Sequence, residues 1–434
     1  MTSTEKSSPT SPPAGNADGK RPTVANKPLR IAYCEGNLDG TVGGSYFSLL
    51  YLVTGLDKTE FEPVVVFRRD HPFLDRYREA GIRTVVMPIN VHTRATGAGD
   101  VHDRRGVLGK INAKYRAATS FFRLFVFDSI RVAWWLLRNR IRLVHLNNSV
   151  TRLHSWMLAA RIVGVPCISH ERGLNTRYSR MSRYFAPRLD RVICISQAVQ
   201  DNLAAHGVAS LNTTVVHNGL DPAIFEPTRA VAEIRHELGL EADAPLIGMV
   251  GNIREWKGQD VVVRAMGCLV KNHPDLTCVF VGGGTESDRP FRTRIEGLVH
   301  ELGISEHVIF AGYKDDPANW MNAMDIVVHA SVNPEPFGRV LIEAMALGKP
   351  LVGARAGAVP EIVDEPRCGL TFAPGDHHGL YTAVSALLSD EQQRLAMGAA
   401  GRQRARDSFG IERNVQGTQN IYREVLQLRT GKAR

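Results

Sequence analysis

The stretch IVVHASVNPEPFGRVLIEAM, residues 326–345, decides the fold class that this sequence predicts. It opens with a short apolar run, 326–329, and continues through a loop into the start of a helix. A buried strand, a loop and a helix form the repeating unit of parallel α/β sheets. In such sheets the loop and the first helical turn face the ligand crevice, and the free N–H groups of that turn suit a phosphate.

Similar units repeat on both sides of this stretch. A chain of 434 residues is too long for one ordinary core and suits two domains of about 150–200 residues. We therefore predict an α/β fold of two Rossmann-like domains whose parallel sheets face each other across a central cleft. The short apolar or β-branched runs that predict strands cover 29–34, 63–67, 83–88, 143–147, 167–170, 192–196, 214–217, 246–250, 277–281, 308–310, 326–329, 351–352 and 370–372.

The predicted domain boundary lies where Asn-Gly, Asp-Pro and Glu-Pro pairs cluster, at 218–227. It separates an N-terminal domain, 28–218, from a C-terminal domain, 219–408. Residues 1–27 are rich in Ser, Pro and Gly, and we expect a disordered tail there. Apolar residues recur at helical spacing over 409–428, which predicts a helix that packs back on the first domain, as in related folds.

Charge and cysteine usage indicate which partners and which cellular compartment to expect. The net charge is +9, and residues 101–200 alone hold 18 basic and 4 acidic residues, a net charge of +14. This excess favours a polyanionic partner, and a solvated arginine-rich face is the alternative. The six cysteines contain no CxxC pair, the N-terminus lacks the apolar region of a secretory signal, and charges interrupt the longest apolar stretch. We therefore expect a cytoplasmic protein without a transmembrane helix.

Two glutamates of the opening stretch are candidate ligand-binding groups. Glu335 and Glu343 are eight residues apart, at most about 12 Å along a helix. A diphosphate bridging two sugar rings spans about this reach, so each carboxylate is predicted to bind the hydroxyl groups of one sugar. Gly338 removes a side chain where the ligand would approach the backbone. Glu335 lies in a loop and is expected to be outside the core, and two solvated glutamates are the alternative.

A second strand end, residues 250–259, reads VGNIREWKGQ and combines a glycine loop with cations. Arg254 and Lys257 are predicted to neutralise a diphosphate, and two exposed basic residues are the alternative. The chain contains no Asp-x-Asp pair of the kind that would hold Mg²⁺ against a diphosphate. The charge of the leaving group must then be met by side-chain cations and helix N–H groups, so metal-free chemistry is predicted.

Three further strand ends carry weaker signals. Gly43 and Gly44 lie in a glycine-rich loop after the first strand, a common feature of α/β domains. Gly283 follows another strand and is predicted to lie beside the base or ribose of a nucleotide. His170 closes a strand of the first half, and a structural histidine is the alternative there.

These elements together resemble the retaining GT-B glycosyltransferases of family 4, the glycogen-synthase-like group. The resemblance is strong over 215–376 and weaker over 29–196. It implies a nucleotide-diphosphate-sugar donor, UDP- or GDP-linked, held mainly by the C-terminal domain, with no other cofactor. The motifs that carry it are GGS, VHLNN, SHERG, VICISQAV, VVHNGLDPAIFEP, VGNIREWKGQD, VFVGGG, VIFAGY and GRVLIEAMALGKPLVGARAGAVPEIV.

The resemblance also implies roles for single residues. Glu335, His170 and Lys257 form the catalytic set: Glu335 binds the donor sugar, His170 approaches it from the first domain, and Lys257 holds the diphosphate. Glu343 binds the ribose hydroxyls. The remaining donor contacts are implied for loop and backbone positions, namely Gly251, Phe337, Gly338, Arg339, Val340 and Gly283.

One departure from the family concerns Asn252, where the family usually has an arginine. Arg254, two residues on, is expected to replace that charge. On the acceptor and phosphate side, the resemblance implies contacts from Gly43, Gly44 and Arg172.

The implied activity is retaining hexosyl transfer to a glycan or lipid-linked acceptor in cell-envelope or exopolysaccharide synthesis. Double displacement would need a carboxylate nucleophile beneath the anomeric carbon, and none can be identified, so same-face substitution is expected. Two alternatives remain: a nucleotide-sugar epimerase on the same fold, and a catalytically silent nucleotide-sugar-binding scaffold. An epimerase would turn over without an acceptor.

The segment 121–142 bears on where the protein works. At 100° per residue, Arg123, Phe127, Arg131, Trp134 and Arg138 fall within one arc of about 80°. Cations among large aromatic residues suit the headgroup region of an anionic bilayer, and burial of the aromatic residues in the first domain is the alternative. The expected partners are therefore the sugar donor, its acceptor and an anionic membrane surface at the inner face of the cytoplasmic membrane, with no nucleic acid.

Overall fold

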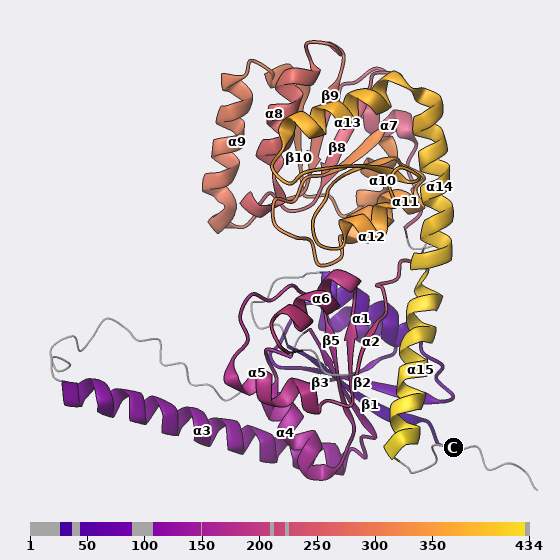
Figure 1. Cartoon of the computed structure of the whole chain (residues 1–434). Helices are drawn as coiled ribbons and strands as arrows, with labels where there is room; N and C mark the ends of the chain where they lie inside the picture. Colours follow the sequence, from indigo (N-terminus) through magenta and orange to yellow (C-terminus); the bar gives the residue numbers. More distant parts are fainter. Residues whose placement is uncertain are drawn as a thin grey trace, which may run out of the picture.

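Two parallel β-sheets organise the computed structural model, which describes residues 27–36, 44–88, 107–148, 150–208, 212–221 and 225–429, the side chains of 107–121 and 428–429 excepted. The first sheet has seven strands in the order β3-β2-β1-β4-β5-β6-β7, and the second has six in the order β10-β9-β8-β11-β12-β13. Figure 1 shows the two sheets one above the other, each flanked by helices. The predicted fold of two Rossmann-like domains is confirmed.

All strand pairs are parallel. The first sheet comprises β1 (Leu29–Glu35), β2 (Phe61–Phe67), β3 (Arg83–Val86), β4 (Leu143–Asn147), β5 (Cys167–Glu171), β6 (Arg191–Cys194) and β7 (Thr213–Val215). The second comprises β8 (Leu246–Val250), β9 (Thr277–Val281), β10 (Val308–Gly312), β11 (Ile326–His329), β12 (Leu351–Ala354) and β13 (Gly369–Phe372).

Helices connect these strands. In the first half they are α1 (Gly44–Gly55), α2 (Leu74–Glu79), α3 (Val107–Arg138), α4 (His154–Val163), α5 (Arg180–Phe185) and α6 (Gln197–Ala205). In the second half they are α7 (Val231–Glu237), α8 (Gln259–Leu269), α9 (Arg289–Glu301), α10 (Pro317–Ala323), α11 (Arg339–Ala346), α12 (Val359–Val363), α13 (His377–Ser389), α14 (Glu391–Phe409) and α15 (Ile411–Arg429).

Each of the thirteen predicted strands is present, and the ends differ by a residue or two. The strands β4 and β9, for example, are buried at all five of their positions. A strand covered by helices on both faces needs apolar residues at successive positions, whereas a half-exposed strand alternates. The continuous apolar runs of this sequence are therefore the direct signature of a covered parallel sheet.

Both sheets contain a point at which the strand order reverses. The strand β1 lies between β2 and β4, and β8 lies between β9 and β11. Loops that leave neighbouring strands at such a point run in opposite directions, which opens a crevice at the carboxyl ends of the strands. Three predicted site residues follow strands at these points, since Gly44 follows β1, Gly251 follows β8 and Glu335 follows β11.

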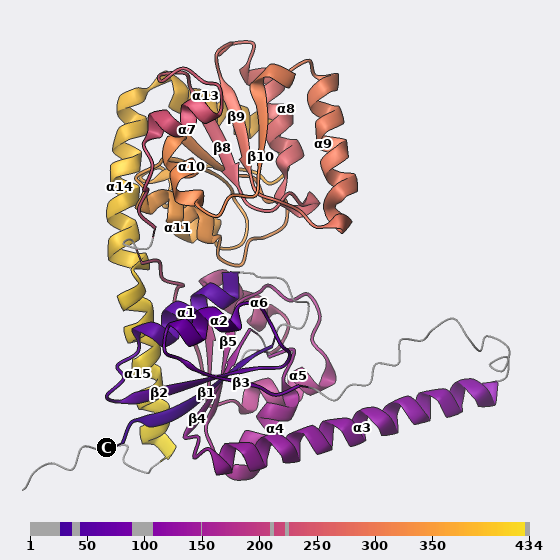
Figure 2. The same cartoon turned by 180° about the vertical axis from the view of Figure 1, so that it is seen from behind.

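The two C-terminal helices connect the halves. Figures 1 and 2 show α14 beside the second sheet and α15 beside the first. The helix α15 begins at Ile411, after Gly410, and packs along α1. Its Ile421 and Val425 are buried in the same apolar cluster as Ile31 of β1. The predicted C-terminal helix therefore lies against the first half of the chain.

Tyr422 of α15 completes a hydrogen-bond chain buried in the first half. The Tyr33 hydroxyl donates to Tyr422 Oη at 3.0 Å, and Tyr422 Oη lies 2.7 Å from His145 Nδ1. Burial, together with the charge of Arg172, lowers the pKa of His145 to about 3. The imidazole is thus neutral, and its Nδ1 can accept a hydrogen bond from the Tyr422 hydroxyl.

We expect Tyr422→Phe to lower the free energy of unfolding by about 1–3 kcal/mol, because it removes a partner from two buried polar groups. Urea unfolding measures this change, and Tyr51→Phe on α1, a half-buried tyrosine, is the matched control. An equal effect of the two substitutions would show that this hydrogen bond does not stabilise the packing of α15.

Candidate functional site

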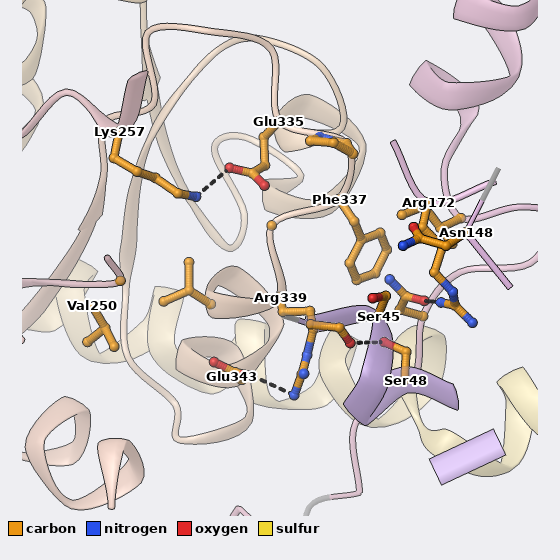
Figure 3. A pocket seen from close by; sticks show the side chains of 17 residues that line it. Ser45, Ser48, Asn148, Arg172, Val250, Lys257, Glu335, Phe337, Arg339 and Glu343 are labelled. Carbon is orange, nitrogen blue, oxygen red and sulfur yellow. Dashed lines mark hydrogen bonds and ion pairs between the residues drawn. The ribbon is translucent and has the colours of Figure 1, made fainter. Parts of the chain in front are cut away.

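A cavity of about 490 Å³ lies between the two sheets, at the carboxyl ends of β8 and β11 and at the start of α1 and α11. Residues from both halves line it, as Figure 3 shows. The predicted site residues among them are Gly44, Arg172, Gly251, Lys257, Glu335, Phe337, Gly338, Arg339, Val340 and Glu343. Ten predicted positions, spread over three hundred residues of sequence, therefore surround one space.

Glu335 is the centre of a buried ion-pair cluster in this cavity. Lys257 Nζ donates to Glu335 Oε2 at 2.8 Å, and His329 Nε2 and Ser331 Oγ lie 3.1 and 3.2 Å from the same oxygen. Burial alone would raise the pKa of Glu335, but the hydrogen bond with His329 and the charge of Lys257 outweigh it, so this pKa lies well below its usual range. The carboxylate is ionised and accepts hydrogen bonds only.

The placement of Glu335 corrects one expectation. The residue lies in a loop, as predicted, but only 9% of it is exposed, so it belongs to the packed interior. The loop is pinned by Gly357, whose φ is +62° and where a Cβ atom would come within 2.2 Å of the Glu335 carbonyl oxygen. Ala358 donates its N–H to that oxygen at 2.9 Å. Only glycine allows the two segments to approach so closely.

The start of α11 presents backbone N–H groups and a cation to the cavity. Gly338 precedes the helix with φ +82°, and Gly338, Arg339 and Val340 all line the cavity. The first N–H groups of a helix have no partner within it, and they favour an anion. The Arg339 guanidinium donates to Glu343 Oε1 at 3.0 Å, one turn further along.

The Arg339 side chain also spans the cavity toward the first half. Its guanidinium carbon lies 5.6 and 5.9 Å from the ring centroids of Phe47 and Tyr51 on α1. Cations are attracted to aromatic faces at this range. The sequence predicted only a backbone role for Arg339, so the structure adds a side-chain cation that bridges the two halves.

Sequence models of two known families match this chain. A sequence model of the glycosyl transferases group 1 matches residues 231–404, and one of glycosyltransferase family 4 matches residues 42–224. This chain belongs to the group 1 glycosyltransferases. The predicted family membership is confirmed.

Two curated relatives are similar to this chain over more than half of its length. D-inositol 3-phosphate glycosyltransferase of Corynebacterium kroppenstedtii is 34% identical over 245 residues, which are 55% of this chain and 54% of that protein. A lipopolysaccharide core biosynthesis mannosyltransferase of Rhizobium meliloti is 28% identical over 58% of this chain and 70% of its own length. The match thus spans about half the length of the first relative.

Solved structures share the fold of this protein over nearly the whole chain. HepE of Anabaena in complex with UDP superposes with a TM-score of 0.76 at 22% identity, covering 91% of this chain and 100% of that one. Sucrose-phosphate synthase of Thermosynechococcus elongatus gives a TM-score of 0.68 at 21% identity, covering 92% and 100%. At these identities the likeness establishes the GT-B fold and leaves the substrate open.

His170 does not line the cavity between the sheets. The side chain is completely buried at the end of β5, and its Nδ1 lies 3.3 Å from Arg172 Nη2. Burial and the charge of Arg172 lower the pKa of His170 well below its usual value, so the imidazole is neutral. The structure therefore places His170 behind Arg172, and in this arrangement Arg172 rather than His170 reaches the cavity.

Three predicted donor contacts also lie outside the cavity. The Arg254 guanidinium lies 3.5 Å from Asp288 Oδ2, and Arg254 is not among the residues that line the cavity. Asn252 accepts a hydrogen bond from Gln259 through its backbone oxygen, and Gly283 accepts one from Ile253. The fourth remaining position, Gly43, falls outside the described residues.

The cavity includes residues that the sequence analysis did not assign, from both sheets: Ser45, Ser48, Asn148, Ile195, Asn218, Val250 and Pro336. Asn148 follows β4, and Asn218 comes shortly after β7 and accepts a hydrogen bond from Arg172 at 2.7 Å. Their positions just after strand ends were a usable signal, because the carboxyl ends of parallel strands meet at one edge. Within the described residues, no cluster of His, Cys, Asp and Glu is arranged to hold a metal ion.

Proposed function

We propose that this chain is a retaining glycosyltransferase that moves a hexosyl group from a UDP- or GDP-linked sugar to a glycan or lipid-linked acceptor in cell-envelope or exopolysaccharide synthesis. The observation that carries the proposal is the arrangement around α11. There an ionised Glu335, the Lys257 ammonium, the Arg339–Glu343 pair and a helix N-terminus face one cavity between the sheets. The curated relatives named above, one of which is a mannosyltransferase, support the same class of reaction.

The donor is proposed to bind along this arrangement. The diphosphate would lie at the start of α11, where N–H groups and the Arg339 guanidinium are available. The Lys257 ammonium has three donors and uses one for Glu335, so others can reach the diphosphate. Glu335 would accept hydrogen bonds from the hydroxyl groups of the transferring sugar. Glu343 keeps one oxygen outside its bond with Arg339, which would accept from the ribose.

The reaction is proposed to proceed on one face of the sugar. The bond between the anomeric carbon and the diphosphate oxygen breaks while the acceptor hydroxyl oxygen forms its bond from the same side. The acceptor proton passes to the departing diphosphate oxygen. The protein contributes by stabilising the negative charge that develops on that diphosphate through Lys257, Arg339 and the α11 N–H groups. Since Arg254 is engaged with Asp288, Arg339 replaces it in this proposal.

Product analysis tests this function. The protein is mixed with a panel of nucleotide sugars and a membrane extract, and Glu335→Gln protein serves as the inactive control. We expect release of nucleoside diphosphate and a glycosylated product that both require the extract. An epimerised nucleotide sugar formed without any extract would instead support the epimerase alternative, and absence of turnover with every donor would support a binding scaffold.

We further propose that transfer needs no added metal ion, because the chain lacks an Asp-x-Asp pair and offers Lys257, Arg339 and a helix N-terminus to the diphosphate. We expect the rate to change by less than about twofold when EDTA is added, since side-chain cations already supply the charge stabilisation. A rate that falls with EDTA and returns with Mg²⁺ or Mn²⁺ would contradict this prediction.

The acceptor is proposed to be met at an anionic membrane surface. The +14 net charge of residues 101–200, against a net charge of −6 over 201–434 from 23 basic and 29 acidic residues, supports this setting.

A further inference from the structure

The helix α3 carries an unusual share of the exposed apolar surface. Thirteen large apolar side chains of the described residues are exposed, and six of them lie on this helix: Phe122, Leu124, Phe127, Ile130, Trp134 and Leu137. Figures 1 and 2 show α3 leaving the first sheet and extending away from the body of the protein. No helix in the described part of the chain is long and apolar enough to cross a membrane, so this surface needs another explanation.

Five of these six exposed residues form one face of the helix, and Phe122 lies outside it. At 100° per residue, Leu124, Phe127, Ile130, Trp134 and Leu137 fall within an arc of about 140°, and Arg123 and Arg138 fall within the same arc. We call these seven residues the docking face. The opposite side of the helix holds the buried Val132 and Leu136, and α3 packs there against α4. The helix is therefore already seated in the protein, and the docking face points outward.

The exposure of these side chains tests two expectations from the sequence, one about the aromatic residues and one about Arg131. Phe127 and Trp134 are 63% and 61% exposed, so they do not pack into the first domain. Arg131, by contrast, is only 28% exposed at its side chain, because it donates to Asp128 at 2.8 Å and to the Pro88 carbonyl at 2.6 Å. Arg131 thus helps to hold α3 against the first half of the chain, and we do not include it in the docking face.

The charge on this face is positive. Asp128 is the single acidic residue of 107–138, and it is bonded to Arg68 and Arg131 rather than to any residue of the docking face. The Arg138 guanidinium carbon lies 5.4 Å from the Trp134 ring centroid, so cation and aromatic ring lie together. A second copy of the chain is a poor occupant, because pairing two such faces would bring arginines against arginines.

The basic, apolar character continues beyond the helix. A cavity of about 470 Å³ opens at the C-terminal end of α3, and it is lined by Leu137, Val163 and Leu426 together with Arg140 and Arg142. Neither this cavity nor the docking face shares a residue with the cavity between the sheets. Binding at the docking face therefore does not need to compete with the proposed donor.

We propose that the docking face of α3 binds the surface of an anionic lipid bilayer. The aromatic and aliphatic side chains would enter the headgroup region, and Arg123, Arg138, Arg140 and Arg142 would lie against lipid phosphates. Large apolar residues interleaved with arginines, without an acidic residue, match that interface. This inference rests on the proposed function in one respect only, namely that the membrane is where the acceptor would be met.

Vesicle flotation tests the proposal with the full chain. Vesicles of phosphatidylcholine alone are compared with vesicles of equal parts phosphatidylcholine and phosphatidylglycerol, at low and at high salt. We expect binding to the anionic vesicles that weakens with salt, and little binding to the neutral ones. Equal binding to both vesicle types, or no binding at low salt, would overturn the proposal.

Substitutions on the docking face test whether this surface carries the binding to vesicles. Because each arginine near an anionic surface contributes about fivefold to binding, Arg123→Glu/Arg138→Glu should weaken it by about 25-fold or more. Arg264→Glu/Arg289→Glu makes the same change in net charge at exposed sites of the second half and should bind far more tightly than that variant. Phe127→Ser/Trp134→Ser should weaken binding by at least about tenfold, whereas Leu395→Ser, at an exposed leucine of α14, should not.

Two further measurements separate this proposal from others. Glu335→Gln protein should bind vesicles as the unchanged protein does, so loss of transfer activity leaves the docking result interpretable. Sedimentation should show the same oligomeric state for the unchanged protein and for Phe127→Ser/Trp134→Ser. Conversion of a dimer to a monomer by that variant, with vesicle binding retained, would assign the docking face to a second copy and overturn the proposal.

Discussion

Replacing Glu335 by glutamine is expected to lower the rate of sugar transfer by about two to three orders of magnitude. Glutamine keeps the size of the side chain but removes the negative charge that would accept hydrogen bonds from the transferring sugar. Losing one such charge-assisted contact in the transition state corresponds to about 2–4 kcal/mol. Steady-state measurement of nucleoside diphosphate release, with the donor and acceptor found by product analysis, reports the change.

The substitution should also affect stability, because Glu335 is buried against Lys257 and His329. We expect a loss of about 1–3 kcal/mol in the free energy of unfolding, since Lys257 and His329 both lose their carboxylate partner. Glu301→Gln, at the exposed end of α9, is the matched control and should change neither rate nor stability. A folded Glu335→Gln protein with nearly normal turnover would contradict the role assigned to this residue.

The pH dependence of that stability loss has a definite sign. In the folded protein the pKa of Glu335 lies well below the ordinary glutamate value of 4.5, because His329 and Lys257 outweigh the effect of burial. A lowered folded-state pKa stabilises the protein above the ordinary value, and the stabilisation is lost as the pH falls through the folded-state pKa. The difference between the unchanged protein and Glu335→Gln should therefore be full at neutral pH and should shrink below about pH 4.5.

Lys257→Met is expected to lower the transfer rate by about a hundredfold. Methionine preserves most of the side-chain length, but it removes the ammonium that would stabilise the departing diphosphate. It also leaves Glu335 buried with only His329 and Ser331 as partners, which should cost about 1–3 kcal/mol of unfolding free energy. Chemical denaturation and steady-state kinetics measure the two effects separately.

A double variant separates the structural from the catalytic part. Lys257→Met/Glu335→Gln removes both charges, so its stability loss should be smaller than the sum of the two single losses. Its transfer rate should nevertheless stay as low as that of the worse single variant. Lys314→Met, which breaks the surface pair with Glu237, is the matched control and should cost at most about 1 kcal/mol. Additive stability losses at Lys257 and Glu335 would show that the two groups are not coupled.

The site shows which parts of it local sequence predicts. Glu335, Gly338 and Glu343 lie on one strand–loop–helix element, and their separation along the chain already limits their separation in space. The same reasoning could not locate the Arg254 and His170 side chains, because the contacts of each come from the folded surroundings. Asp288, more than thirty residues away, holds the Arg254 guanidinium, and the layers packed around β5 bury His170 completely.

The sequence by itself determined the two parallel sheets and the loops that would bear the site. A strand covered on both faces must be apolar at successive positions. This requirement is local, so a run of a few residues is enough to predict each strand. The strand order, the crossing of Arg339 to α1 and the exposure of Phe127 and Trp134 on α3 depended on the tertiary structure. Helical spacing shows which residues share a face, but whether another element covers that face depends on how distant segments pack.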